Sequence, residues 1–133
     1  MTASPKKKKV SLAKLKAKLQ KVFNAYIRKR DENQKCISCG KVKKLQAGHY
    51  YPVSGYDGLR FLEINANGEC AGCNCFDQSH LISYGINLEK KIGVNRMIEL
   101  HEAARDYKRN GNKFLRYEIE EMIEIYKRKI KEL

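Results

Sequence analysis

The sequence predicts a small α+β protein, and three observations support this prediction. Apolar residues recur at helical spacing near both ends of the 133-residue chain. The middle, residues 31–80, is instead rich in glycine and carries only short apolar runs. Two cysteine pairs of equal spacing, Cys36/Cys39 and Cys70/Cys73, enclose most of this middle segment. We therefore expect short strands and a metal site between two helical regions.

The domain organisation follows from these changes in composition. We expect one domain over residues 11–133, after a disordered basic tail over residues 1–10 that has almost nothing apolar to bury. Within the domain we expect three parts: a basic helix over 11–30, a metal-bearing core over 31–85 and a helical region over 86–133.

The charge of the chain favours a nucleic-acid partner. Lys and Arg number 28 against 15 Asp and Glu, which gives a net charge of +13. Eleven of the positive charges lie in residues 1–30, which contain no acidic residue. Such asymmetry is typical of proteins that bind DNA or RNA. A mean hydropathy of −0.65 and the lack of a long apolar run exclude a membrane span.

The first helix is predicted from its cap and its periodicity. Ser11 is a suitable N-cap, and apolar residues recur every three or four positions as far as Ile27. Lysines fill the positions between them. The expected phosphate contacts of this end of the chain are Lys6, Lys7, Lys8, Lys9, Lys14, Lys18, Lys21, Arg28 and Arg30. Any one of these lysines could instead be part of a solvated face.

Further elements are predicted along the rest of the chain. Strands are expected at Val42–Tyr51 and Leu59–Ile64, with a loop between them. Helices are expected from near Asn74, over Val94–Arg109 and, after a break at Asn110-Gly111, from about Lys113. The last helix carries an apolar stripe that would form either part of the core or a homodimer seam: Ile119, Met122, Ile123, Tyr126 and Ile130.

The paired cysteines predict structural zinc. The chain has five cysteines, an odd number, and no secretory signal, so a disulfide framework is not expected. Cys36, Cys39, Cys70 and Cys73 have the spacing of a four-thiolate zinc site, which leaves no position open for catalysis. Cys75 is left as a spare thiol.

Residues between and after the cysteine pairs have the arrangement of an HNH nuclease. His49 lies at the end of the first expected strand, where an imidazole can deprotonate a water molecule. Asn65 lies across from it and would orient the imidazole. Asn74 directly follows Cys73 and would hold a catalytic divalent ion. Arg60 is expected to reach a phosphate near the cut.

Five short segments resemble the NinG (Rap) recombination proteins of lambdoid phages. They are residues 23–28, 36–42, 47–50, 59–61 and 70–74, within a likeness that spans about residues 20–100. The resemblance implies a zinc-stabilised treble-clef, ββα-metal (HNH) core. It also implies a phage recombination endonuclease that acts on branched DNA such as Holliday junctions.

One position departs from the HNH arrangement. Many HNH proteins carry Asp or His before the catalytic histidine as a metal ligand, whereas this chain has Gly48. Mg²⁺ tolerates such a loss because water and substrate phosphates complete its coordination. Asp77 and His80 are candidate extra ligands, and Mn²⁺ would suit an imidazole better than Mg²⁺ does.

Two alternatives remain open from the sequence. The first is a non-catalytic zinc module that binds nucleic acid, in which Gly48 marks a decayed active site. The second concerns location: we expect the cytoplasm of a bacterial host, but residues 5–10 resemble a nuclear localisation signal. A symmetric four-way junction needs two cuts, so a homodimer is also expected.

Overall fold

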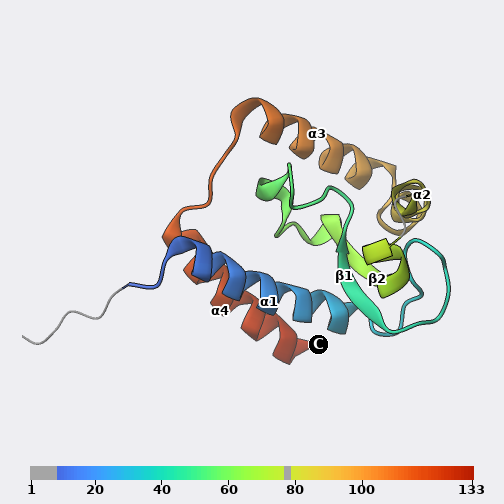
Figure 1. Ribbon diagram of the computed structural model, residues 1–133, viewed down its shortest axis with the longest axis horizontal. Coiled ribbons are helices and arrows are strands. Elements are labelled where there is room, and N and C mark those ends of the chain that lie inside the picture. The colour runs from blue at the N-terminus through green and yellow to red at the C-terminus, as the bar shows by residue number, and fades with distance from the viewer. Residues whose placement is uncertain (1–8, 77–78) are drawn as a thin grey trace, which may run out of the picture.

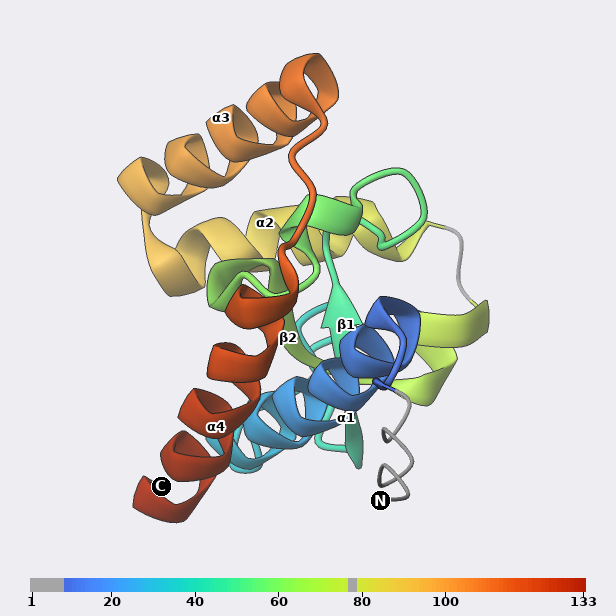
Figure 2. The ribbon, with the colours of Figure 1, turned by 90° about the vertical axis from the view of Figure 1, so that its left-hand side faces the viewer.

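In residues 9–76 and 79–133, which the computed structural model describes, four α-helices enclose a two-stranded antiparallel ribbon. Helices α1 (Leu12–Arg30) and α4 (Arg116–Glu132) lie side by side on one side of the ribbon (Figure 1). Helices α2 (His80–Ile92) and α3 (Val94–Asn110) pack together on the other side (Figure 2). This arrangement confirms the predicted α+β class. None of the helices in the described ranges is long and apolar enough to cross a membrane.

The ribbon consists of β1 (Leu45–His49) and β2 (Ala66–Cys70). Leu45 pairs with Cys70 and His49 pairs with Ala66. The strand predicted over residues 59–64 is wrong, and the second strand begins only after this segment. Leu59 ends one short 3₁₀ turn, Asp57–Leu59, and Glu63 begins another, Glu63–Asn65. Tertiary packing explains the absence of this strand. Residues two apart on a strand share one face, whereas Leu59 and Phe61 are buried in two different apolar clusters.

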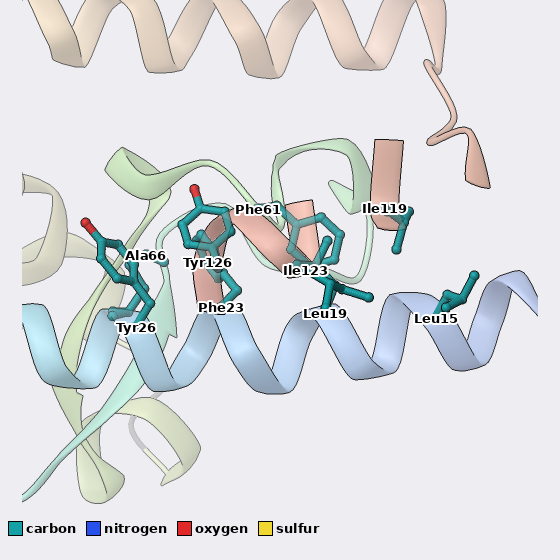
Figure 3. Packing of buried hydrophobic residues seen from close by; sticks show 10 residues of the cluster. Leu15, Leu19, Phe23, Tyr26, Phe61, Ala66, Ile119, Ile123 and Tyr126 are labelled. Carbon is teal, nitrogen blue, oxygen red and sulfur yellow. The ribbon is translucent and has the colours of Figure 1, made fainter. Parts of the chain in front are cut away.

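Helix α1 begins and packs as its sequence predicts. The Ser11 hydroxyl accepts a hydrogen bond from the Lys14 N–H at 3.2 Å, and Arg28 to Arg30 lie at the C-terminal end, where positive charge is favourable. Its apolar residues meet those of α4, so this stripe of α4 lies in the core of its own chain (Figure 3). The buried members of this cluster include Leu15, Leu19, Phe23, Tyr26, Ile119, Ile123 and Tyr126.

Two glycines set the boundaries of the later helices. Gly93 has a φ of +86° and separates α2 from α3. Gly111 has a left-handed conformation, and its N–H bonds to the Tyr107 carbonyl at 2.7 Å as α3 ends. The predicted break at Asn110-Gly111 is confirmed. The helix expected from near Asn74 instead begins at His80, after a π-helical turn, η3, over Gly72–Phe76.

Candidate active site and metal centre

Four cysteines meet at one end of the ribbon. Cys36 and Cys39 lie in the turn before β1, Cys70 ends β2, and Cys73 lies in η3. Their sulfur atoms all lie within 4.8 Å of one another, and those of Cys39 and Cys70 are 3.9 Å apart. Tetrahedral zinc would place sulfurs about 3.8 Å apart. The four cysteines can therefore hold a structural metal such as zinc.

The surroundings of the cluster also fit thiolate ligands. The Cys36 sulfur accepts backbone N–H bonds from Cys39 at 3.5 Å and from Cys70 at 3.3 Å. Burial and the neighbouring thiols raise the pKa of Cys73, so a cation is needed to keep four thiolates together. Cys75 is exposed and does not belong to the cluster.

His49 is the last residue of β1, and its imidazole is held by a backbone carbonyl. Its Nε2 lies 2.9 Å from the Arg60 oxygen. A carbonyl can only accept, so Nε2 carries the proton and donates it, which leaves the Nδ1 lone pair free to accept a proton. Burial lowers the pKa of His49, and the positive charge of Arg60 lowers it further. The hydrogen bond to the Arg60 carbonyl raises this pKa, but by less than the other two effects lower it. The imidazole is therefore neutral at pH 7 and can act as a base.

The structure corrects the role expected of Asn65. Its amide does not bond to the imidazole among the described residues: it donates to the Leu59 and Tyr51 carbonyls, each at 3.1 Å, and accepts the Tyr51 N–H at 2.9 Å. Asn65 is fully buried. It fixes the loop that carries the Arg60 carbonyl, so it can orient His49 only through that loop.

Asn74 and His80 lie toward the α2 side of the ribbon, and neither is hydrogen-bonded to His49. The Asn74 amide donates to Gln46 Oε1 at 2.8 Å. His80 Nδ1 lies 2.6 Å from Glu69 Oε2. Asp77, the other candidate ligand, lies outside the described residues.

Glu69 is a site residue that sequence reasoning missed. Its carboxylate is fully buried, with Oε2 bound to the Ser38 hydroxyl and to His80. Buried carboxylates are rare unless they are paired or bind a metal. The sequence offered one signal of this role: Glu69 directly precedes Cys70, one of the four cysteines expected to bind zinc.

The outer surface of α1 carries exposed positive charges. Lys14, Lys18, Lys21 and Arg28 are exposed and share one helix face, and none forms an ion pair with another described residue. Lys9 is also exposed, and Lys6 to Lys8 lie outside the described ranges. The predicted basic surface is thus present on α1.

Arg30 and Arg60 do not belong to that surface, which corrects their assignment to phosphates. Arg30 binds both carboxylate oxygens of Asp31 at 2.8 Å and the Ala66 carbonyl at 2.8 Å. Arg60 binds Asp57 at 2.9 Å and Gln20 at 2.8 Å. Both guanidinium groups are therefore engaged within the protein.

Comparison with known proteins gives one consistent family. The family model described as Bacteriophage Lambda NinG protein matches residues 2–133. The protein ninG of Escherichia phage lambda is 36% identical over 119 residues, and that of Salmonella phage P22 is 35% identical over 119 residues. Each alignment covers 86% of this chain but only 54% and 55% of the relatives, so the chain spans about half their length. No solved structure matches it.

Proposed function

The chain belongs to the NinG family of lambdoid phages, and from that premise we propose that it is an HNH-type endonuclease that hydrolyses DNA during phage recombination. Branched DNA such as a Holliday junction is the expected substrate, and the infected bacterial cell is the expected place of action. In this proposal, the ribbon, the cysteine cluster and η3 form a zinc-stabilised treble-clef ββα-metal core.

The geometry of His49 is the observation that carries the proposal. Its protonated Nε2 is held by the Arg60 carbonyl at 2.9 Å, and burial lowers its pKa. The unprotonated Nδ1 can then take a proton from water as that water attacks the phosphate. Asn65 supports this role by fixing the loop that carries Arg60.

The second part of the reaction needs charge stabilisation. When bound, a divalent ion such as Mg²⁺ or Mn²⁺ would stabilise charge on the phosphate and on the leaving oxygen. Asn74 would hold this ion, and His80 would act beside it through Glu69. The reacting phosphate would have to reach both this ion and His49.

Helix α1 would supply the electrostatic part of DNA binding. Lys14, Lys18, Lys21 and Arg28 present four charges on one face that have no ion-pair partner among the described residues. Each phosphate that such a residue neutralises releases counterions, so the affinity should fall as the salt concentration rises.

One observation favours a second candidate, a non-catalytic zinc module that binds nucleic acid. Gly48 provides no ligand, and His49 and Asn74 have separate hydrogen-bond partners. Metal-dependent cleavage separates the two candidates.

The test uses the purified zinc-containing protein with synthetic four-way junctions and linear duplexes, in Mg²⁺, Mn²⁺ or chelator. We expect metal-dependent cleavage, and His49→Ala should slow it by a factor of about 10²–10⁴. His101→Ala is the matched control, because His101 lies on α3 and bonds to Tyr51. Zinc content and junction affinity should stay the same in both variants.

A third variant distinguishes the base from the ion site. Asn74→Ala should lose activity that a higher metal concentration partly restores, whereas His49→Ala should not respond to metal. Tight junction binding without cleavage under any metal condition would favour the non-catalytic module.

A further inference from the structure

One oxygen of the buried Glu69 carboxylate has no hydrogen-bond partner in the part of the chain that the structure describes. Among the described residues, its Oε1 is the one buried side-chain nitrogen or oxygen atom without a hydrogen bond. The residue is 0% exposed, while its other oxygen, Oε2, is bound by Ser38 and His80. A buried, half-satisfied carboxylate is unfavourable unless a proton, a water molecule or a cation completes it.

A second oxygen points to the same place. If Gly48 carried a Cβ atom, that atom would lie 3.2 Å from Asn74 Oδ1, 2.9 Å from Glu69 Cβ and still closer to Glu69 Oε1. Both oxygens therefore lie within 3.2 Å of one point beside the Gly48 backbone. The absence of a side chain at Gly48 is what leaves this space for them.

The neighbours of the two oxygens hold them in this orientation. The Asn74 Nδ2 group donates to Gln46 Oε1 at 2.8 Å, which directs Oδ1 the other way. His80 and Ser38 bind Oε2 of Glu69, so Oε1 is the oxygen turned toward Gly48. Gln46 and Asn74, which border the space, are only partly buried.

We propose that Glu69 Oε1 and Asn74 Oδ1 bind a divalent metal ion beside Gly48. Glu69 on β2 would supply the carboxylate that β1 lacks, and His80 would be a positioning residue that holds Glu69. Two oxygen ligands suit Mg²⁺ or Mn²⁺, which completes its coordination with water and substrate phosphate. Only the catalytic use of this ion rests on the proposed function.

The experiment measures Mn²⁺ binding to the zinc-containing protein without DNA, by electron paramagnetic resonance of free Mn²⁺. We expect one Mn²⁺ per chain, displaced by Mg²⁺. Glu69→Gln should weaken this binding by more than about tenfold, because it replaces the charged ligand at nearly equal size. Glu63→Gln is the matched control and should leave binding unchanged, because Glu63 pairs with Lys129 at 2.6 Å on the α4 side.

Two further variants test the place of the carboxylate. Gly48→Ala removes no ligand but puts a methyl group where the oxygens converge, so it should also weaken Mn²⁺ binding. The double variant Gly48→Asp with Glu69→Ala moves the carboxylate from β2 to β1 and should regain binding that Glu69→Ala alone loses. Circular dichroism and zinc content verify that each variant is folded.

The outcomes separate this inference from the proposed function. A protein that binds no Mn²⁺, or whose Glu69→Gln variant binds it as the wild type does, overturns the inference even if DNA is cut. A protein that binds Mn²⁺ through Glu69 but cuts no DNA upholds the inference and contradicts the nuclease.

Discussion

Burial determines what the His49 side chain can do near neutral pH. Desolvation and the Arg60 charge lower the pKa of His49 below its usual 6.5, although the Arg60 carbonyl opposes this change. A base must be unprotonated, so kcat/KM for DNA cleavage should rise with pH and level off, with its midpoint below 6.5. Arg60→Gln should move the midpoint upward, because it removes a positive charge and keeps the carbonyl. A midpoint above 6.5 in the wild type would contradict this assignment.

Asp31 shows the opposite balance between burial and charge. Burial alone would raise the pKa of its carboxyl, but Arg30, the Gly68 N–H and Lys91 bind the carboxylate and lower the pKa below the usual value. Its contribution to stability is therefore present above pH about 4 and is lost as the pH falls through the lowered pKa.

The Asp31→Asn variant tests this network. It removes a buried carboxylate and leaves the partly buried Arg30 and Lys91 without their charged partner, so we expect the free energy of unfolding in urea at pH 7 to fall by about 3 kcal/mol. The exposed Asp106→Asn should change it by less than about 0.5 kcal/mol. The gap between wild type and Asp31→Asn should narrow below pH 4, and a gap that stays constant down to pH 2 would contradict the argument.

Residues whose chemistry depends on spacing were predicted better than residues whose chemistry depends on burial. The four cysteines follow from the repeated interval, and the structure brings them together. Glu69 was missed because a carboxylate on a short strand is usually solvated, and only long-range packing by His80 and Ser38 buries it. The contacts of Asn65 were also missed, because they depend on the conformation of the loop that its amide binds.

The elements differ in the same way. The helices follow from periodic apolar residues, which is a local signal, and α1 and α3 lie close to their predicted limits. Strand β2 has no such signal: it contains Asn67 and Gly68, which have low strand propensity, and all its residues are buried. Its formation depends on β1 and on the contacts of the Gly68 N–H with Asp31, which no local pattern indicates.

In the proposed function, helix α1 supplies the positive charge that binds DNA. Replacing Lys14, Lys18, Lys21 and Arg28 with Gln should weaken junction binding and reduce the slope of log affinity against log salt by up to about 0.9 for each lost phosphate contact. The same number of exposed charges on the C-terminal part of the chain provides the control: Lys113, Lys127, Arg128 and Lys131. Equal effects of the two sets on the salt slope would show that binding depends on net charge and not on α1.

At the scale of the whole molecule, the apolar stripe of α4 that suggested a homodimer is covered by α1 of the same chain. Ile119, Ile123 and Tyr126 of α4 are buried against α1 of the same chain. The requirement for two cuts in a symmetric junction still predicts two copies on DNA. Light scattering of the protein with and without junction DNA measures this, and a monomer in both states would contradict the prediction.

The cysteine cluster joins the ribbon to the turn that precedes it and to η3. A two-stranded ribbon is marginally stable by itself, and here the turn before β1, the end of β2 and η3 meet at four sulfurs. The free energy of metal binding to such a site also stabilises the folded state.

We therefore expect one zinc per chain, and Cys73→Ser should lose the metal and lower the melting temperature. Cys75→Ser is the matched control, two residues away and outside the cluster. Elemental analysis and thermal melts decide the matter: a folded, reduced wild type without metal, or equal damage from both variants, would show that the ribbon is held by packing alone.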